Sequence, residues 1–186
     1  MYLILVLTIS CSMKTKQADR KPEIIDNKLS ENKISEDSII IENKITHNFS
    51  SLENKDEFSI LIKGKSLLEG KVIFRITSLE GIEIYKEEFP PVYLIGYGLL
   101  NDASEKEQEN FIKKRISEFF TEDCFSQPAI EKDSPYVEDY SNKDFWEEIK
   151  ADQTSVGFRF LVGEEDNRSI AFSKKSKKVI LYFNCC

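Results

Sequence analysis

Four cysteines are the residues whose type and position point most directly to chemistry. Cys11 follows an apolar run, whereas the other three lie far downstream at Cys124, Cys185 and Cys186. In an oxidising compartment, a disulfide from Cys124 to Cys185 or Cys186 would hold the C-terminus onto the helix that is expected just before Cys124. It would stabilise the fold by about 3–4 kcal/mol. Three reduced thiols, or a vicinal link between Cys185 and Cys186, are the alternatives.

Other residue types that support catalysis or metal binding do not form a recognised pattern. The only histidine is His47, which precedes the expected domain and is expected to be solvated, so neither a Ser-His nor a Cys-His pair can be assembled there. Three thiolates without a histidine are too few soft ligands for a closed zinc shell. We therefore expect no catalytic set, no metal and no cofactor, with a carboxylate-based enzyme as the alternative.

Two short motifs favour turns over ligand sites. Glu164-Glu165-Asp166 lacks the alternating oxygen ligands and the internal glycine of a calcium loop, so it predicts a solvated turn. Gly96-Tyr97-Gly98 lacks the further glycine and the lysine of a phosphate-binding loop. It predicts a bend after Pro90-Pro91, where the absent backbone N–H ends a strand.

The N-terminus carries a targeting pattern. Residues 2–9 form an apolar run that is too short to cross a hydrocarbon layer, which needs about 20 helical residues, but has the length of a secretory h-region. Thr8-Ile9-Ser10-Cys11 resembles the lipobox of bacterial lipoproteins. The resemblance implies that residues 1–10 are a signal peptide and that Cys11 receives diacylglycerol and a further acyl chain such as palmitate. The alternative is a hydrophobic N-terminal strand with an incidental cysteine.

The same resemblance implies an address. In lipoproteins of double-membraned bacteria, an aspartate after the lipidated cysteine favours retention at the inner membrane, and here Ser12 follows. The outer membrane is therefore the expected location, with the domain facing either the periplasm or the outside. The stretch Phe74-Arg75-Ile76 to Phe89 and the closing Tyr182 to Cys186 are also similar to envelope lipoproteins of Bacteroidota-type bacteria. This similarity carries no motif of known chemistry.

Composition divides the rest of the chain in two. Between residues 12 and 56, eight Lys or Arg and nine Asp or Glu surround scattered apolar residues, and Phe49 is the only Phe, Tyr or Trp. Such a segment buries too little apolar surface to offset chain entropy, so residues 11–56 are expected to be a lipidated cysteine and a flexible stalk. Ile39-Ile40-Ile41 is the one place where a short strand is the alternative. A single domain is expected over residues 57–186.

Periodicity within residues 57–186 predicts six strands and two helices. The helical spacing covers residues 103–122, capped by Asp102 or Ser104, and residues 142–151, capped by Ser141 or Asn142. The second helix is expected to bury Phe145, Trp146 and Ile149. The strands are expected at residues 58–62, 71–77, 82–89, 156–162, 169–173 and 179–183. This β-β-β-α-α-β-β-β order predicts an α+β fold, an antiparallel sheet of about six strands with two helices.

Charge and composition favour a binding role. The formal charge is −7 and the only dense basic cluster, Lys174 to Lys178, lies between two expected strands, where lysines commonly solvate a turn. Nucleic acid is therefore not an expected partner. We expect a membrane-tethered, non-enzymatic binding or structural module that meets an envelope protein through its sheet or through residues 93–100. An exposed apolar patch at residues 93–100 would support this. An inhibitor or immunity-like partner of an envelope enzyme is a further alternative.

Overall fold

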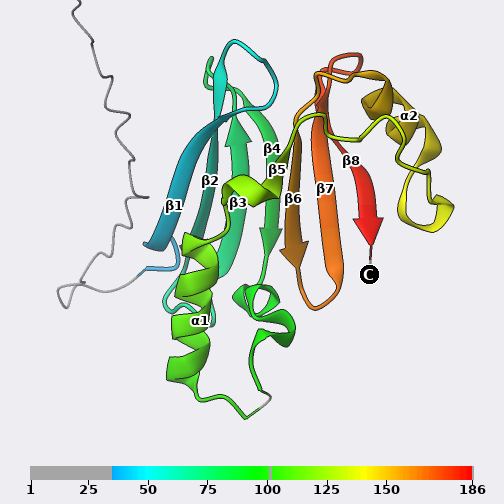
Figure 1. Ribbon diagram of the computed structural model, residues 1–186. Helices are drawn as coiled ribbons and strands as arrows, with labels where there is room; N and C mark the ends of the chain where they lie inside the picture. Colours follow the sequence, from blue (N-terminus) through cyan, green and yellow to red (C-terminus); the bar gives the residue numbers. More distant parts are fainter. Residues whose placement is uncertain (1–34, 101, 186) are drawn as a thin grey trace, which may run out of the picture.

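The computed structural model describes residues 35–100 and 102–185, which fold into two antiparallel four-stranded sheets and two helices (Figure 1). The first sheet has the order β1-β2-β3-β4, and the second has the order β5-β6-β7-β8. The strands are β1 (Ile39–Asn48), β2 (Lys55–Lys63), β3 (Lys71–Thr77), β4 (Glu83–Phe89), β5 (Phe125–Ser126), β6 (Gly157–Val162), β7 (Asp166–Ser173) and β8 (Lys178–Cys185). The α+β class is confirmed, but the single sheet of about six strands is wrong.

Both helices begin at the caps that the sequence offers. Helix α1 (Glu105–Ser117) starts with a capping box, in which the Ser104 hydroxyl accepts from the Glu107 N–H and the Glu107 carboxylate accepts from the Ser104 N–H. Helix α2 (Lys143–Ala151) is capped by the Asn142 side chain. In the described part of the chain, four 3₁₀ turns accompany these helices: η1 (Pro91–Leu94), η2 (Gly96–Gly98), η3 (Glu122–Cys124) and η4 (Glu138–Tyr140).

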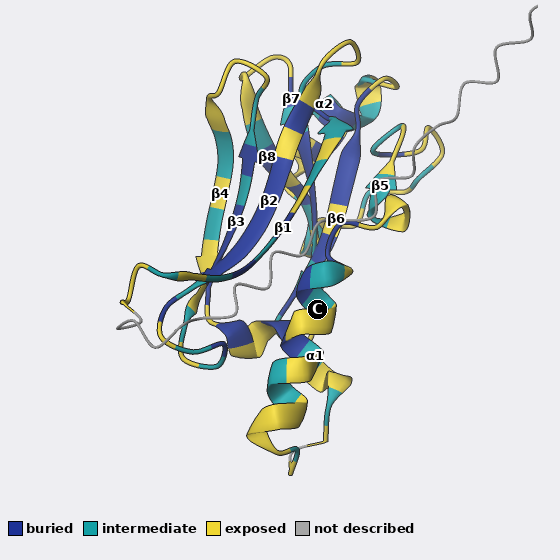
Figure 2. Ribbon diagram, turned by 90° about the vertical axis from the view of Figure 1, so that its left-hand side faces the viewer, coloured by how far each residue is buried: buried dark blue, intermediate teal, exposed yellow. Residues whose placement is uncertain are grey.

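The main core lies between the two sheets and consists largely of phenylalanine rings. Phe58 of β2 meets Phe158 of β6 with ring centroids 5.3 Å apart, and Phe74 of β3 meets Phe160 at 5.2 Å. Phe119 and the adjacent Phe120, which follow α1, join the same cluster. Figure 2 shows this buried interior along β2, β3 and β6, whereas β4 consists mostly of exposed and intermediate residues. Edge-to-face contacts of this kind fix the sheets against each other.

A second, smaller core covers the outer face of the second sheet. Trp146 and Ile149 of α2 pack against Ala171 of β7 and against Ile180 and Tyr182 of β8. Phe145 does not take part, because its side chain is 42% exposed. The expectation that α2 buries Phe145 is therefore wrong, since the helix turns only one narrow face toward the sheet.

The folded part begins before Glu57, within the segment that the composition assigned to a stalk. Strand β1 pairs with β2 from Ile39 to Asn48, so the alternative of a strand around residues 39–41 is correct. Its Asn43 is buried and donates from its side-chain amide to the Ile116 carbonyl at 2.8 Å, which satisfies a carbonyl in the last turn of α1. The stalk prediction is wrong for β1, because a strand needs only a few apolar residues to cover the neighbouring strand β2, and the overall composition of the segment did not show them. The expected signal peptide at residues 1–10, Cys11 and the rest of residues 1–34 lie outside the described residues.

Candidate functional site

The clearest candidate site is built by the chain that follows β4. Pro91 starts the short turn η1, and η2 follows at once, so residues 91–98 form the bend expected from the proline pair. The Gly163 N–H donates to the Tyr93 carbonyl at 2.9 Å, which holds this bend beside the turn between β6 and β7. Gly96 is required there, because its φ is +51° and a Cβ would lie 2.7 Å from the Gly163 carbonyl oxygen.

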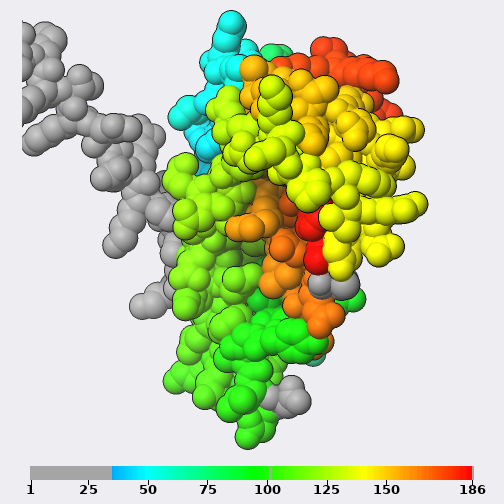
Figure 3. Space-filling model, turned by 45° about the vertical axis from the view of Figure 1, so that its right-hand side comes forward, coloured from blue at the N-terminus to red at the C-terminus, as the bar shows by residue number. Residues whose placement is uncertain are grey.

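A groove of about 550 Å³ lies between this bend and the β6–β7 turn. Its apolar side is formed by Val92, Tyr93, Ile95 and the neighbouring Leu99 and Leu100. Its opposite side is formed by the turn at residues 162–166. In Figure 3 the bend (green) and the turn (orange) adjoin at the lower end of the molecule.

Several large apolar side chains at this groove face solvent. The exposed fraction is 56% for Val92, 46% for Tyr93, 69% for Tyr97 and 81% for Leu100. In contrast, Leu94 is buried and anchors the bend in the main core. Exposed apolar side chains that gather on one bend of the surface are typical of a protein-binding surface. The structure therefore shows the exposed apolar cluster that residues 93–100 would need for such a role.

The rim of the groove is acidic. Glu164 and Glu165 form no ion pair with any described residue, and the Tyr97 hydroxyl donates to Glu165 Oε1 at 3.2 Å. Hydrogen bonds to Glu164 and Glu165 raise the pKa of Tyr97, so its hydroxyl keeps its proton to a higher pH than that of an unperturbed tyrosine. Asp166 is different, because it binds Arg168. The motif at residues 164–166 thus leaves two carboxylates available to a cation from outside.

Of the expected pairings, the structure tests only the one between Cys124 and Cys185, and these two cysteines are not joined. Cys124 ends η3 just before β5, whereas Cys185 ends β8, so the two lie at opposite edges of the second sheet. With β6 and β7 between them, no disulfide joins them. The Cys124 sulfur lies 3.3 Å from the Thr121 hydroxyl. The two other pairings involve Cys186, which lies outside the described residues.

His47 is half-buried, and the expectation that it is simply solvated is wrong. Its ring stacks on Phe125 with centroids 3.9 Å apart, its Nδ1 lies 2.8 Å from the Asn48 carbonyl oxygen, and its Nε2 lies 3.9 Å from Glu122. The contacts with Phe125 and Glu122 tie β1 to β5 of the second sheet and to the turn η3 before it. Within residues 35–100 and 102–185, no three His, Cys, Asp or Glu side chains gather into a metal-binding group.

The carboxyl groups whose pKa the structure shifts are stabilised in the charged form. Lys86 and Lys71 lower the pKa of Glu88 to about 2, and the Ser104 bonds lower that of Glu107. Burial alone would raise the pKa of Asp152, but hydrogen bonds from Lys174 and Thr154 outweigh it, and the pKa is lowered. A carboxyl group that acts as a general acid needs a raised pKa instead.

No family model, curated protein or solved structure matches this chain. In the part of the chain that the structure describes, no helix is both long and apolar enough to cross a bilayer.

Proposed function

We propose that this protein is a lipid-anchored binding module of the bacterial envelope, tethered at Cys11 and expected at the outer membrane. The module binds another envelope protein through the groove between residues 91–100 and the β6–β7 turn. The observation that carries the proposal is the exposed cluster of Val92, Tyr93, Tyr97 and Leu100 on a bend that the main core holds in place. A lipid anchor fits a binding role because it concentrates the module at one surface.

The chemistry of the groove defines the partner segment. Apolar side chains from the partner would cover Tyr97 and Leu100, and tyrosine is among the residues that contribute most at interfaces. A lysine or arginine beside them would meet Glu164 and Glu165, which have no described cation partner. The expected partner surface is therefore apolar with at least one flanking basic residue.

Photocrosslinking in intact cells tests the interface. A photoreactive phenylalanine analogue at position 97 or 100 is expected to crosslink one envelope protein, whereas the same analogue at the exposed position 113 on α1 is not. The crosslinked segment must carry the apolar and basic residues defined above. The double variant Glu164→Lys/Glu165→Lys should reduce the crosslink at least about tenfold, as expected for the loss of a favourable charge contact. Equal crosslinking at 97 and 113 would remove the support for this interface.

A crosslinked enzyme whose activity falls on binding would identify the inhibitor or immunity-like version of the role.

The anchor is tested separately. In a lipoprotein-competent bacterium, the full chain is expected to lose residues 1–10, gain acyl mass and stay with membranes, whereas Cys11→Ala should be released into the soluble fraction. Intact mass spectrometry and membrane partition measure both properties. A full-length, soluble wild-type protein would refute the tether while leaving the groove experiment meaningful.

A further inference from the structure

A second cavity, independent of the groove, lies on the outer face of the second sheet. It has a volume of about 350 Å³, within the range that small-ligand sites occupy. Strands β6 to β8 form its floor, and the segment between β5 and α2 forms its wall. In Figure 3 it is the hollow where orange and red atoms lie between the light green and the yellow segments.

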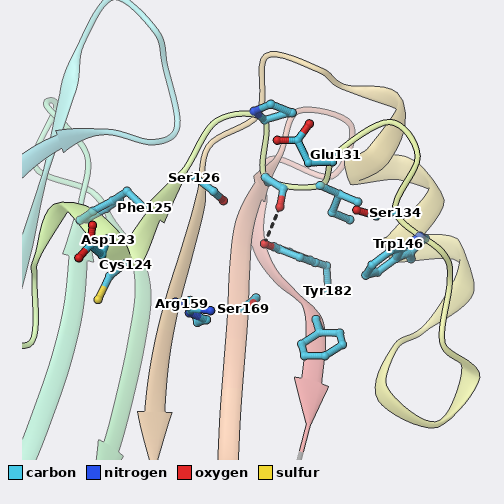
Figure 4. Close-up of a pocket in the computed structure, with 14 residues that line it drawn as sticks. Asp123, Cys124, Phe125, Ser126, Glu131, Ser134, Trp146, Arg159, Ser169 and Tyr182 are labelled. Atoms are coloured by element: carbon cyan, nitrogen blue, oxygen red, sulfur yellow. Dashed lines mark hydrogen bonds between the residues drawn. The ribbon is translucent and has the colours of Figure 1, made fainter.

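The floor presents a cation and several hydroxyl groups. Arg159 of β6 stands directly opposite Ser169 of β7, and the two side chains lie side by side in Figure 4. Arg159 is exposed and lines the cavity. No described residue forms an ion pair or a hydrogen bond with its side chain. Tyr182 extends from β8 toward β6, and its hydroxyl donates to the Ala129 carbonyl at 3.0 Å. A guanidinium beside hydroxyl groups is suited to binding a carboxylate.

Glycine at position 157 makes this arrangement possible. A Cβ at Gly157 would lie 2.7 Å from both the Ser126 hydroxyl oxygen and the Tyr182 hydroxyl oxygen. It would also lie 3.1 Å from the Ala129 Cα. The close approach of three segments over β6 therefore depends on a residue without a side chain.

The walls add aromatic surface and negative charge. Trp146 and Phe183 line one side, and Asp123 and Glu131 lie at two other places around the opening. Neither carboxylate forms an ion pair with a described residue, and neither one pairs with Arg159. The cavity thus holds an unpaired cation and unpaired anions that are kept apart around an apolar wall.

We propose that this cavity binds a small zwitterion with an apolar side chain, namely an amino acid or a dipeptide. The carboxylate of the ligand lies on the Arg159 guanidinium, its ammonium group faces Glu131 or Asp123, and its side chain packs on Trp146 and Phe183. A simple anion would leave the carboxylates without a role, and a simple cation would be repelled by Arg159. This binding does not depend on the groove at residues 91–100.

The chain contains a built-in reporter for the test, because Trp146 is its only tryptophan. The full-length protein would be titrated with L-phenylalanine, L-leucine and the dipeptide Leu-Phe while Trp146 fluorescence is recorded. At least one of them is expected to change the emission with saturation below about 10 mM, and saturation-transfer NMR should confirm direct contact. The absence of both signals for all three probes would overturn the proposal.

Variants and analogues distinguish a zwitterion site from non-specific hydrophobic binding. Arg159→Gln should weaken binding about tenfold or more, whereas the matched variant Lys113→Gln, exposed on α1, should not. Phenylalaninamide, which lacks the carboxylate, and N-acetylphenylalanine, which lacks the ammonium, should both bind more weakly than phenylalanine. If N-acetylphenylalanine binds as tightly, the cavity is a site for organic anions and the zwitterion assignment is wrong. Should Arg159→Gln not fold, as judged by circular dichroism, the two analogues still decide the question on the wild-type protein.

Discussion

Tyr182 shows how one residue contributes to both structure and site. Its ring is buried in the smaller core, and its hydroxyl connects β8 to the segment that covers the cavity. Burial raises the pKa of Tyr182 to about 12, although hydrogen bonds from Ser169 and Ser126 act in the opposite direction. The neutral phenol is therefore the form that the fold requires.

This pKa predicts a loss of stability in alkali. In the unfolded chain Tyr182 ionises near pH 10, whereas in the folded protein it keeps its proton to about pH 12. The unfolded state thus binds fewer protons between these values, so the free energy of unfolding falls as the pH rises from 10 to 12, and the stabilisation is fully present only below pH 10. Urea unfolding at pH 8, 10, 11 and 12 measures this decline.

Tyr182→Phe is the matched variant. At pH 8 it should be less stable by about 1 kcal/mol, because the Ala129 carbonyl loses its donor. Above pH 10 its stability should fall less steeply than that of the wild type, since the titrating group is absent. If the free energy of unfolding falls equally with pH in the two proteins, Tyr182 does not titrate between pH 10 and 12.

At the scale of elements, the capping box sets the start of α1. Ser104→Ala removes the side-chain acceptor for the Glu107 N–H and is expected to lower the free energy of unfolding by about 1 kcal/mol. Asn110→Ala, at an exposed position inside the same helix, serves as the control and should be neutral or slightly stabilising. Thermal and urea unfolding measure both, and equal effects of the two variants would argue against the cap.

Strand β1 should be indispensable for folding. A chain that starts at Ser35 is expected to unfold cooperatively, whereas a chain that starts at Glu57 should not, because it loses the pairing along β2 and the buried side chains of Ile41 and Phe49. Each such side chain contributes about 1.5–3 kcal/mol by burial, against a typical net stability of 5–15 kcal/mol. Circular dichroism and thermal melting compare the two chains. Cooperative melting of the shorter chain would restore the boundary at residue 57.

The sequence predicted those elements that have a strong local pattern. The hairpin at residues 71–89, its turn at Gly81 and the caps at Ser104 and Asn142 are confirmed, because each depends on residues close in the chain. Strand β5 has only two residues and no pattern to detect. Strand β1 was hidden because its buried positions include Asn43, whose partner on α1 is distant in sequence.

The candidate sites were less predictable than the elements. The bend at residues 91–98 followed from its prolines and glycines, but the groove also needs the β6–β7 turn, which only tertiary packing brings close. The second cavity was missed for the same reason. Its floor combines Arg159, Ser169 and Tyr182 from three strands, and no spacing in the sequence shows that they are neighbours. The division of the strands into two sheets was missed for the same reason, because it depends on contacts between phenylalanines that are far apart in the sequence.

At the scale of the whole molecule, a polar network joins the two sheets at the edge of the phenylalanine core. Arg168 of β7 binds Glu87 of β4 and also Asp166, and the Tyr85 hydroxyl donates to Glu87 Oε2 at 2.6 Å. Asp166 and Glu87 raise the pKa of Arg168, so the guanidinium is charged under all ordinary conditions. Because the side chains of Arg168 and Glu87 are mostly removed from solvent, their attraction is screened less than that of a surface pair.

A double-mutant cycle measures how strongly this network holds the sheets together. Arg168→Met leaves Glu87 half-buried without its cation, and Glu87→Gln keeps an acceptor for Tyr85 while removing the charge. The coupling energy between the two positions is expected to be about 1–3 kcal/mol, below the cost of a fully buried pair because some solvent reaches both groups.

The matched control is the exposed pair of Lys71 and Glu88, whose side chains approach to 2.9 Å within the first sheet, and whose coupling should stay below about 1 kcal/mol. A coupling across the sheets no larger than the control would mean that the phenylalanine core alone holds them together. Asp166 lines the groove and binds the same Arg168, so this arginine connects the rim of the proposed binding surface to the contact that joins the sheets.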